Sequence, residues 1–122
     1  MTKDSPVRVL IVDDSEDQLQ LLRAYFERAG CTVSVASTAR DAMRVWDDAA
    51  PDLTVIDLVL PGMDGWELAA HVRTEHPDCP IVITSVLGEE HYPEGHVVLP
   101  KPVTSEQVRQ ALRATVPRWT AA

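Results

Sequence analysis

The sequence predicts an α/β fold with a doubly wound, five-stranded parallel sheet in the strand order 2-1-3-4-5. Short apolar runs, which are typical of buried strands, alternate along the chain with longer segments whose apolar residues recur at helical spacing. The intervening segments have the length of right-handed crossovers between parallel strands. At 122 residues the chain suits one domain and is too short for two. We therefore expect a single domain over residues 1–122, with its core at about 7–116.

Five strands are expected from the apolar runs. The second run, TVSVA, alternates between apolar and polar residues, which is typical of an edge strand. The third, DLTVID, is apolar on both faces and is expected at the centre of the sheet. The expected strands are 7–12, 32–36, 52–57, 80–84 and 96–99.

Helices are expected where a capping residue precedes an amphipathic stripe. The first runs from a Ser15–Gln18 capping box to a stop at Gly30. The second carries an apolar stripe that includes Trp46, which we expect in the core. The third opens at Asp64 with Glu67 and ends near residue 75, and the last opens at Thr104 with Gln107. The expected N-caps are Ser15, Ser37, Asp64 and Thr104.

The connection between the fourth and fifth strands is unusually short. Only residues 85–95 separate them, whereas a crossover with a helix normally takes a dozen or more residues. Gly88, Pro93 and Gly95 further oppose helix formation in this segment. We expect the fourth helix to be shortened or replaced by a loop.

Composition excludes several classes of function. The formal net charge of −8, from 19 acidic and 11 basic residues, argues against binding to nucleic acid, which needs clustered Lys and Arg. No apolar run has the length of a membrane span, and the N-terminus lacks the pattern of a signal peptide. We expect a cytoplasmic protein without membrane contact, in which Cys31 and Cys79 are free thiols.

Polar and charged side chains stand at the carboxyl ends of four expected strands. In an open parallel sheet these ends line the ligand crevice, so the side chains should converge there. They are Asp13 and Asp14 after the first strand, Asp57 at the end of the third, Thr84 at the end of the fourth and Lys101 after the fifth.

Three converging carboxylates require positive charge. Two of them about 4 Å apart repel by roughly 4 kcal/mol at an effective dielectric constant of 20. An all-oxygen site with few protein ligands suits Mg²⁺, and Lys101 supplies further positive charge. A cation, a lysine and a hydroxyl are also what a phosphoryl group requires. Asp57, on the central strand, is the candidate nucleophile for an aspartyl phosphate.

Four stretches resemble the response-regulator receiver domains of two-component signalling, which have the flavodoxin- or CheY-like fold: VLIVDDSE, VIDLVLPGMDGWEL, PIVITS and PKP. The resemblance covers about residues 7–116. It implies that Asp57 takes a phosphoryl group from the phosphohistidine of a sensor histidine kinase or of a histidine phosphotransfer protein. The phosphorylated domain would then switch protein interactions or relay the phosphoryl group.

The resemblance also implies the roles of the other site residues. Asp14 and Asp57 would ligate Mg²⁺ directly, with Asp13 acting largely through water and the backbone carbonyl of Val59 as a further ligand. Thr84 would hydrogen-bond the phosphoryl group and Lys101 would pair with it. A cis peptide would precede Pro102.

Apolar residues replace polar or aromatic ones at three family positions. Val59 and Val86, two residues after the aspartate and the threonine, cannot orient an attacking water, so slow dephosphorylation is expected. Val98 replaces the usual aromatic switch residue. The signal would therefore pass through residues 86–95 or through another face, such as the first helix. The short fourth connection is similar to a subset of stand-alone receivers, although their usual motif after the threonine is not present.

Two rival functions share parts of this pattern. Aspartate-nucleophile phosphatases need an acid two residues after the nucleophile, and Val59 cannot serve, so a signalling domain is expected rather than an enzyme. A pseudo-receiver that works without phosphorylation is the alternative, but the intact site argues against it. We expect a monomer or weak dimer, no output domain within these residues, and a downstream protein target that the sequence leaves open.

Overall fold

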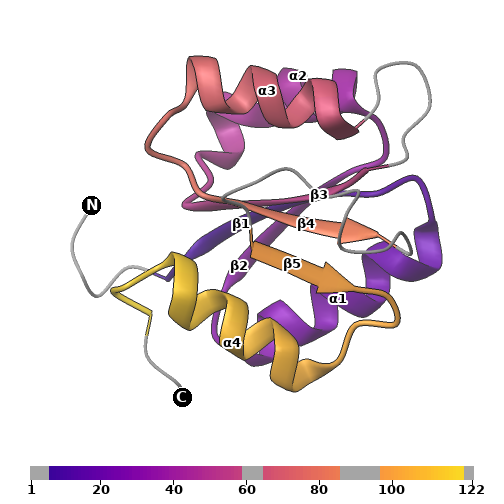
Figure 1. Cartoon of the computed structure of the whole chain (residues 1–122), viewed down its shortest axis with the longest axis vertical. Coiled ribbons are helices and arrows are strands. Elements are labelled where there is room, and N and C mark those ends of the chain that lie inside the picture. Colours follow the sequence, from indigo (N-terminus) through magenta and orange to yellow (C-terminus); the bar gives the residue numbers. More distant parts are fainter. Residues whose placement is uncertain (1–5, 59–64, 86–96, 120–122) are drawn as a thin grey trace.

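The computed structural model describes residues 6–58, 65–85 and 97–119. They form a five-stranded, wholly parallel sheet in the order β2-β1-β3-β4-β5, which confirms the predicted topology. Helices α2 and α3 cover one face of this sheet, and α1 and α4 cover the other (Figure 1). The carboxyl ends of all strands therefore meet at a single edge.

Each strand lies within one residue of its predicted bounds. The alternating strand β2 is at the edge, and β3 is buried at every position, as its apolar run on both faces predicts. The strands are β1 (Arg8–Val12), β2 (Thr32–Ala36), β3 (Leu53–Asp57), β4 (Ile81–Ser85) and β5 (Val97–Pro100).

The described residues contain four helices, α1 (Glu16–Arg28), α2 (Ala39–Ala49), α3 (Gly65–Glu75) and α4 (Ser105–Thr115). Ser15 caps α1 by accepting a hydrogen bond from the Gln18 N–H, and Thr104 forms a complete capping box with Gln107. Gly30, just past α1, has a φ of +91°, the left-handed conformation that glycine adopts readily. None of these four helices is long and apolar enough to cross a membrane.

The predicted cap of α2 is wrong by one residue. The N-cap is Thr38, which has an extended backbone and accepts a 3.0 Å hydrogen bond from the Asp41 N–H, rather than Ser37. Both hydroxyl residues could cap, and the choice follows from where the helix starts. Beginning at Ala39 buries that residue with Trp46 against the sheet. The predicted cap of α3, Asp64, lies outside the described residues.

The connection between β4 and β5 is as short as the sequence predicts, since Ser85 ends one strand and Val97 begins the next. Residues 86–96 themselves lie outside the described residues. The shortened helix or switching loop predicted for that segment therefore stays a prediction.

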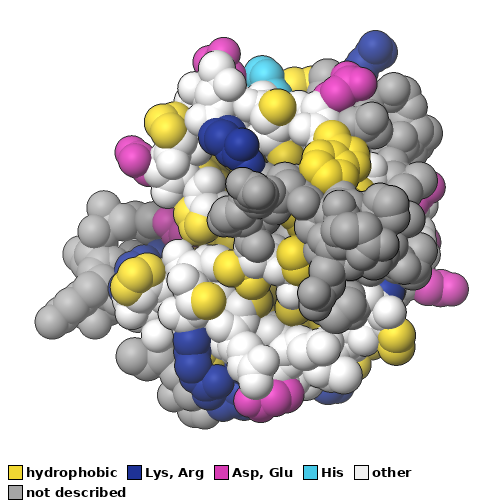
Figure 2. Space-filling view, viewed as in Figure 1, with side chains coloured by type: hydrophobic (Ala, Val, Ile, Leu, Met, Phe, Trp, Pro, Cys, Tyr) yellow, Lys and Arg dark blue, Asp and Glu magenta, His cyan; other side chains and the backbone are white. Residues whose placement is uncertain are grey.

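Apolar side chains alternate between the two faces of the sheet and form two cores. Val9 and Ile11 point towards α1 and α4, whereas Leu10 and Val12 point towards α2 and α3. Trp46 belongs to the second core, as predicted. Charged side chains lie mainly around the periphery of the face seen in Figure 2. Burial on both faces fixes the strand register, because a slip of one residue would exchange the two sets.

The core extends past its predicted limit near residue 116. Trp119 is only 8% exposed, packs in the α1–α4 core, and donates a 2.8 Å hydrogen bond from Nε1 to the Ala29 carbonyl. Next to it, Arg118 forms a 2.8 Å ion pair with Asp52. A single tryptophan after the last amphipathic helix is not part of a periodic apolar pattern, so the sequence did not predict that Trp119 belongs to the core.

Both cysteines are free, as expected. Cys31 is buried and Cys79 is partly buried. Burial raises the pKa of the Cys31 thiol to about 11 and also raises the pKa of Cys79. Both groups are thiols rather than thiolates at neutral pH, which makes them poor nucleophiles.

Trp119→Ala should lower the free energy of unfolding by about 3–5 kcal/mol, because it empties a packed site and removes the hydrogen bond to Ala29. Trp66→Ala is the control. Trp66 is 40% exposed, and its removal should cost less than about 1 kcal/mol. Urea unfolding monitored by circular dichroism measures both. Equal losses would show that Trp119 is not a core residue.

Candidate functional site

Three aspartates meet at the carboxyl edge of the sheet. Asp13 and Asp14 follow β1 and Asp57 ends β3, and one carboxylate oxygen of each lies within 4.8 Å of the other two. Asp13 is completely buried and Asp57 is 5% exposed, whereas Asp14 is exposed. The register that pairs Val12 of β1 with Ile56 of β3 brings them together. Their predicted convergence is confirmed.

Lys101, which follows the edge strand β5, extends to this acidic group. Its Nζ lies 3.1 Å from Asp57 Oδ2 and 3.3 Å from Asp13 Oδ2. Only 20% of its side chain is exposed. The peptide between Lys101 and Pro102 is cis, as the resemblance implies. Lys101 therefore joins residues of two other strands through one ammonium group.

The site carries more negative than positive charge. Burial raises the pKa of Asp13 above its usual range, against the opposing effects of a hydrogen bond from the Ser15 N–H and of Lys101. Burial alone would lower the pKa of Lys101, but its hydrogen bonds and charge interactions with Asp57 and Asp13 outweigh this and raise it. Lys101 is thus a cation at neutral pH. One ammonium faces three carboxylates.

Thr84 completes the group from β4. It pairs in register with Asp57, is 1% exposed, and its hydroxyl has no hydrogen-bond partner among the described residues. Leaving a buried hydroxyl unpaired costs about 1–3 kcal/mol. A donor kept in this state beside a carboxylate is typical of a site that receives an oxygen-rich ligand.

Gly65 is a positioning residue that no sequence motif singled out. It is the first residue of α3, and its N–H donates a 2.9 Å hydrogen bond to the Leu58 carbonyl. A Cβ here would lie 2.5 Å from the Leu58 Cα, 2.8 Å from the Asp57 carbonyl carbon and still closer to the carbonyl oxygen. Only glycine lets α3 lie directly against the backbone that holds Asp57.

The donor set fits Mg²⁺. The three carboxylates offer only oxygen ligands, which this hard cation prefers, and their excess negative charge calls for a divalent ion. A phosphoryl group bound there would meet Lys101 and the unpaired hydroxyl of Thr84. The arrangement can therefore hold a cation and a phosphoryl group together at Asp57.

Three valines also have predicted roles in the site or in the switch. Val59, predicted to ligate through its carbonyl, and Val86 lie outside the described residues. Val98, at the position of the aromatic switch, is half-buried on β5 beside Ile83. His76 stacks on Trp46 at the opposite edge of the sheet, away from the carboxylates.

Known proteins share this sequence pattern and fold. The sequence model of the response regulator receiver domain family matches residues 9–113 of this chain. Response regulator MprA of Mycolicibacterium vanbaalenii is 30% identical over 94% of this chain and 52% of its own length, so the chain spans about half the length of that relative. Chemotaxis response regulator CheY4 of Vibrio cholerae is 25% identical, with a TM-score of 0.83 over 92% of this chain and all of that one.

A further solved structure agrees in fold. The signal receiver domain of a LuxO repressor protein from Vibrio parahaemolyticus has a TM-score of 0.83 at 22% identity, over 93% of this chain and 92% of that one. Receiver domains generally bind Mg²⁺ through an acidic cluster of the kind formed by Asp13, Asp14 and Asp57. The chain therefore belongs to the response regulator receiver domains of two-component signalling.

Proposed function

We propose that Asp57 accepts a phosphoryl group from the phosphohistidine of a histidine kinase or of a histidine phosphotransfer protein. The phosphorylated chain then switches its protein interactions or passes the phosphoryl group on. The observation that carries the proposal is the meeting of Asp57, the Lys101 ammonium and the unpaired Thr84 hydroxyl at one edge of the sheet. Each is a group that phosphoryl transfer requires.

In the transfer step an Asp57 carboxylate oxygen attacks phosphorus and forms an acyl phosphate. The phosphorus–nitrogen bond of the donor breaks, and its electron pair remains on the imidazole nitrogen. Lys101, 3.1 Å from Asp57, stabilises the charge on the transferred oxygens, and the Thr84 hydroxyl donates a hydrogen bond to one of them. Bound Mg²⁺, held by Asp13, Asp14 and Asp57, would supply further charge neutralisation.

The proposed setting is the cytoplasm, with a monomer or weak dimer that acts on proteins rather than on nucleic acid. The formal net charge of −8 supports a protein partner rather than nucleic acid, whose binding needs clustered Lys and Arg. Receiver domains interact in general with histidine kinases and phosphotransfer proteins. In this proposal the chain assists its own phosphorylation and dephosphorylation but has no separate substrate.

Incubation with acetyl phosphate and Mg²⁺ should add the mass of one phosphoryl group to the wild-type chain, because Asp57 is the nucleophile. Asp57→Asn should gain none, whereas Asp48→Asn, which changes an exposed aspartate at the end of α2, should be phosphorylated like the wild type. Intact-mass spectrometry measures all three. No mass gain in the wild type would favour the pseudo-receiver alternative.

Asp13→Asn should melt roughly 3 °C higher than the wild type in Mg²⁺-free buffer, because it removes one of three crowded carboxylates and keeps an oxygen to accept the Ser15 N–H. Added Mg²⁺ should raise the wild-type melting temperature more than that of the variant. Asp17→Asn, an exposed change outside the cluster, should gain nothing. Calorimetry showing a lower midpoint for Asp13→Asn would contradict charge crowding.

The aspartyl phosphate should persist for many minutes in Mg²⁺, because Val59 and Val86 cannot orient an attacking water. Val59→Asn should shorten its lifetime severalfold, because an amide side chain can orient an attacking water where valine cannot. The decay of the phosphorylated mass with time measures both lifetimes. Loss of the wild-type phosphate within seconds would show that these valines do not protect it.

A further inference from the structure

The residues after α4 lie along the amino edge of the sheet, which is formed by the amino ends of its strands. α4 ends at Thr115, and residues 116–119 form a C-terminal strap with a turn in which the Trp119 N–H bonds the Val116 carbonyl. In Figure 1 the end of the described chain, drawn in yellow, lies at the same end of the molecule as the start of β1. The proposed phosphoacceptor residues stand at the carboxyl edge, so the strap is separate from them.

The strap is attached at three places that are far apart in the sequence. Trp119 donates a 2.8 Å hydrogen bond from Nε1 to the carbonyl of Ala29, which lies between α1 and β2. Arg118 donates to Asp52, just before β3, at 2.8 Å and to the Pro6 carbonyl, before β1, at 3.4 Å. The strap therefore joins the amino ends of β1, β2 and β3, which are neighbours in the sheet.

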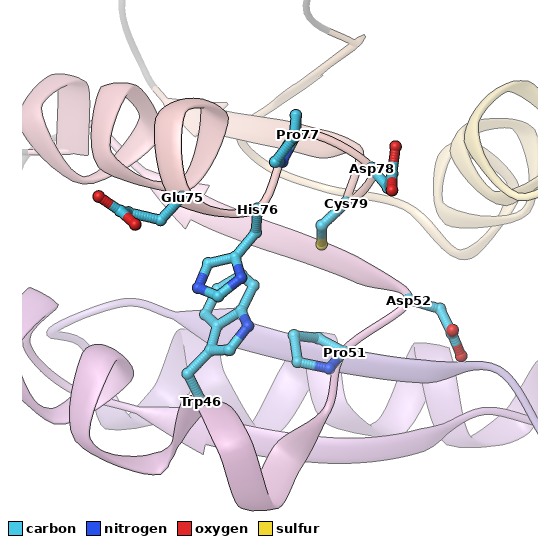
Figure 3. Close-up of a pocket in the computed structure, with 8 residues that line it drawn as sticks. All are labelled: Trp46, Pro51, Asp52, Glu75, His76, Pro77, Asp78 and Cys79. Atoms are coloured by element: carbon cyan, nitrogen blue, oxygen red, sulfur yellow. The ribbon is translucent and has the colours of Figure 1, made fainter.

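Asp52 is the main polar anchor of the strap. Its Oδ2 accepts the backbone N–H of Arg8 at 2.9 Å as well as the guanidinium of Arg118. Figure 3 shows the Asp52 carboxylate pointing away from the stacked rings of Trp46 and His76, which line the neighbouring cleft. Asp52 therefore serves the strap and the start of β1 rather than that cleft.

The thiol of Cys31 lies beside the strap. Cys31 is buried, shares one core with Trp119, and follows Ala29 by two residues. Burial raises the pKa of Cys31 to about 11, and two charges also act on it, Arg118, which lowers the pKa, and Asp52, which raises it. The thiol is therefore close to both attachment points of the strap.

The polar contacts that hold the strap are weak compared with those that hold the sheet. The side chains of Arg118 and Asp52 remain 27% and 22% exposed, and an ion pair in contact with water contributes little to stability. The Trp119 ring is covered by the guanidinium of Arg113, 5.7 Å from its centroid, which is itself exposed. Chain ends attached in this way open at free energies well below that of global unfolding.

We propose that the C-terminal strap opens as one unit while the rest of the domain stays folded. Opening breaks the ion pair between Arg118 and Asp52 together with the indole hydrogen bond of Trp119. It exposes the thiol of Cys31 to solvent and releases the backbone before β1, which Arg118 holds in the closed state. The strap is thus a two-state element at the amino edge of the sheet. The proposal goes beyond the phosphoacceptor function and does not depend on it.

The reactivity of the Cys31 thiol measures this opening. The experiment uses the full chain with Cys79→Ser, so that Cys31 is its one thiol and a hydroxyl still faces Thr54. The probe is dithiobis-nitrobenzoate, which forms a mixed disulfide with the thiolate and releases one coloured thiolate. The folded chain should react roughly 100-fold or more slowly than the urea-unfolded chain, because the closed strap shields the thiol. Low urea concentrations should change the rate little, since opening exposes far less surface than unfolding.

Breaking the ion pair should favour the open strap. Arg118→Gln should raise the rate at Cys31 about threefold, the effect expected of one partly exposed ion pair. Asp52→Asn, which keeps an oxygen for the Arg8 N–H, should raise it by a similar factor. The double variant should raise it no further, because both changes break the same contact. Hydrogen exchange of the Trp119 indole N–H, followed by nuclear magnetic resonance, should accelerate by the same factor as the thiol reaction.

Val72→Ala is the matched control. Val72 is fully buried in the α2–α3 core, so its truncation destabilises the whole domain without touching the strap, and it should leave the rate at Cys31 unchanged. The proposal is overturned if Val72→Ala raises the rate as much as Arg118→Gln, or if the rate depends on urea as steeply as global unfolding. It also fails if the thiol and the indole N–H respond by different factors, if Arg118→Gln has no effect, or if the folded chain reacts as fast as the unfolded one. None of these outcomes bears on phosphorylation of Asp57, so the two proposals are tested separately.

Discussion

The ion pairs from Lys101 to Asp57 and Asp13 hold the functional edge of this protein together. They join three strands of the sheet at 3.1 and 3.3 Å, in a place where the acids are almost fully buried. A buried carboxylate without a partner is costly, and one ammonium cannot fully balance three acids. In the proposed function a divalent cation and a phosphoryl group complete this edge, and the repulsion between its acids favours the binding of the cation.

The apolar sheet makes this charge arrangement possible. Its two cores fix the register between strands, and the register sets Asp57 directly beside Thr84. Gly65 brings the start of α3 against the backbone of Asp57, where any side chain would collide. Trp119 closes the α1–α4 core from the end of the chain. A site that needs charges placed to within a fraction of an ångström thus rests on packing that leaves them little freedom.

The two edges of the sheet use negative charge differently. At the carboxyl edge, Asp13 and Asp57 are buried and meet a fixed lysine, which suits a small ion and a reacting group. At the amino edge, Glu75 and Asp78 are exposed to solvent, near the stacked rings of Trp46 and His76. Buried charges that lie close together can bind an ion and stabilise a reacting group. Dispersed charges on the surface act at longer range, where they attract and orient charged molecules in solution. One strand pair, β3 and β4, connects both edges.

The sequence alone determined the fold class, the strand order and the convergence of Asp13, Asp14, Asp57, Thr84 and Lys101, because period-2 and helical patterns place strand ends and parallel sheets align them. Local signals did not determine whether Ser37 or Thr38 caps α2, since both hydroxyls suit the position and packing of the helix decides. Tertiary structure alone revealed Gly65 as a close-approach residue, Trp119 as part of the core, and the stacking of Trp46 on His76. These three features depend on contacts between residues that are distant in the sequence, and local sequence patterns do not predict such contacts.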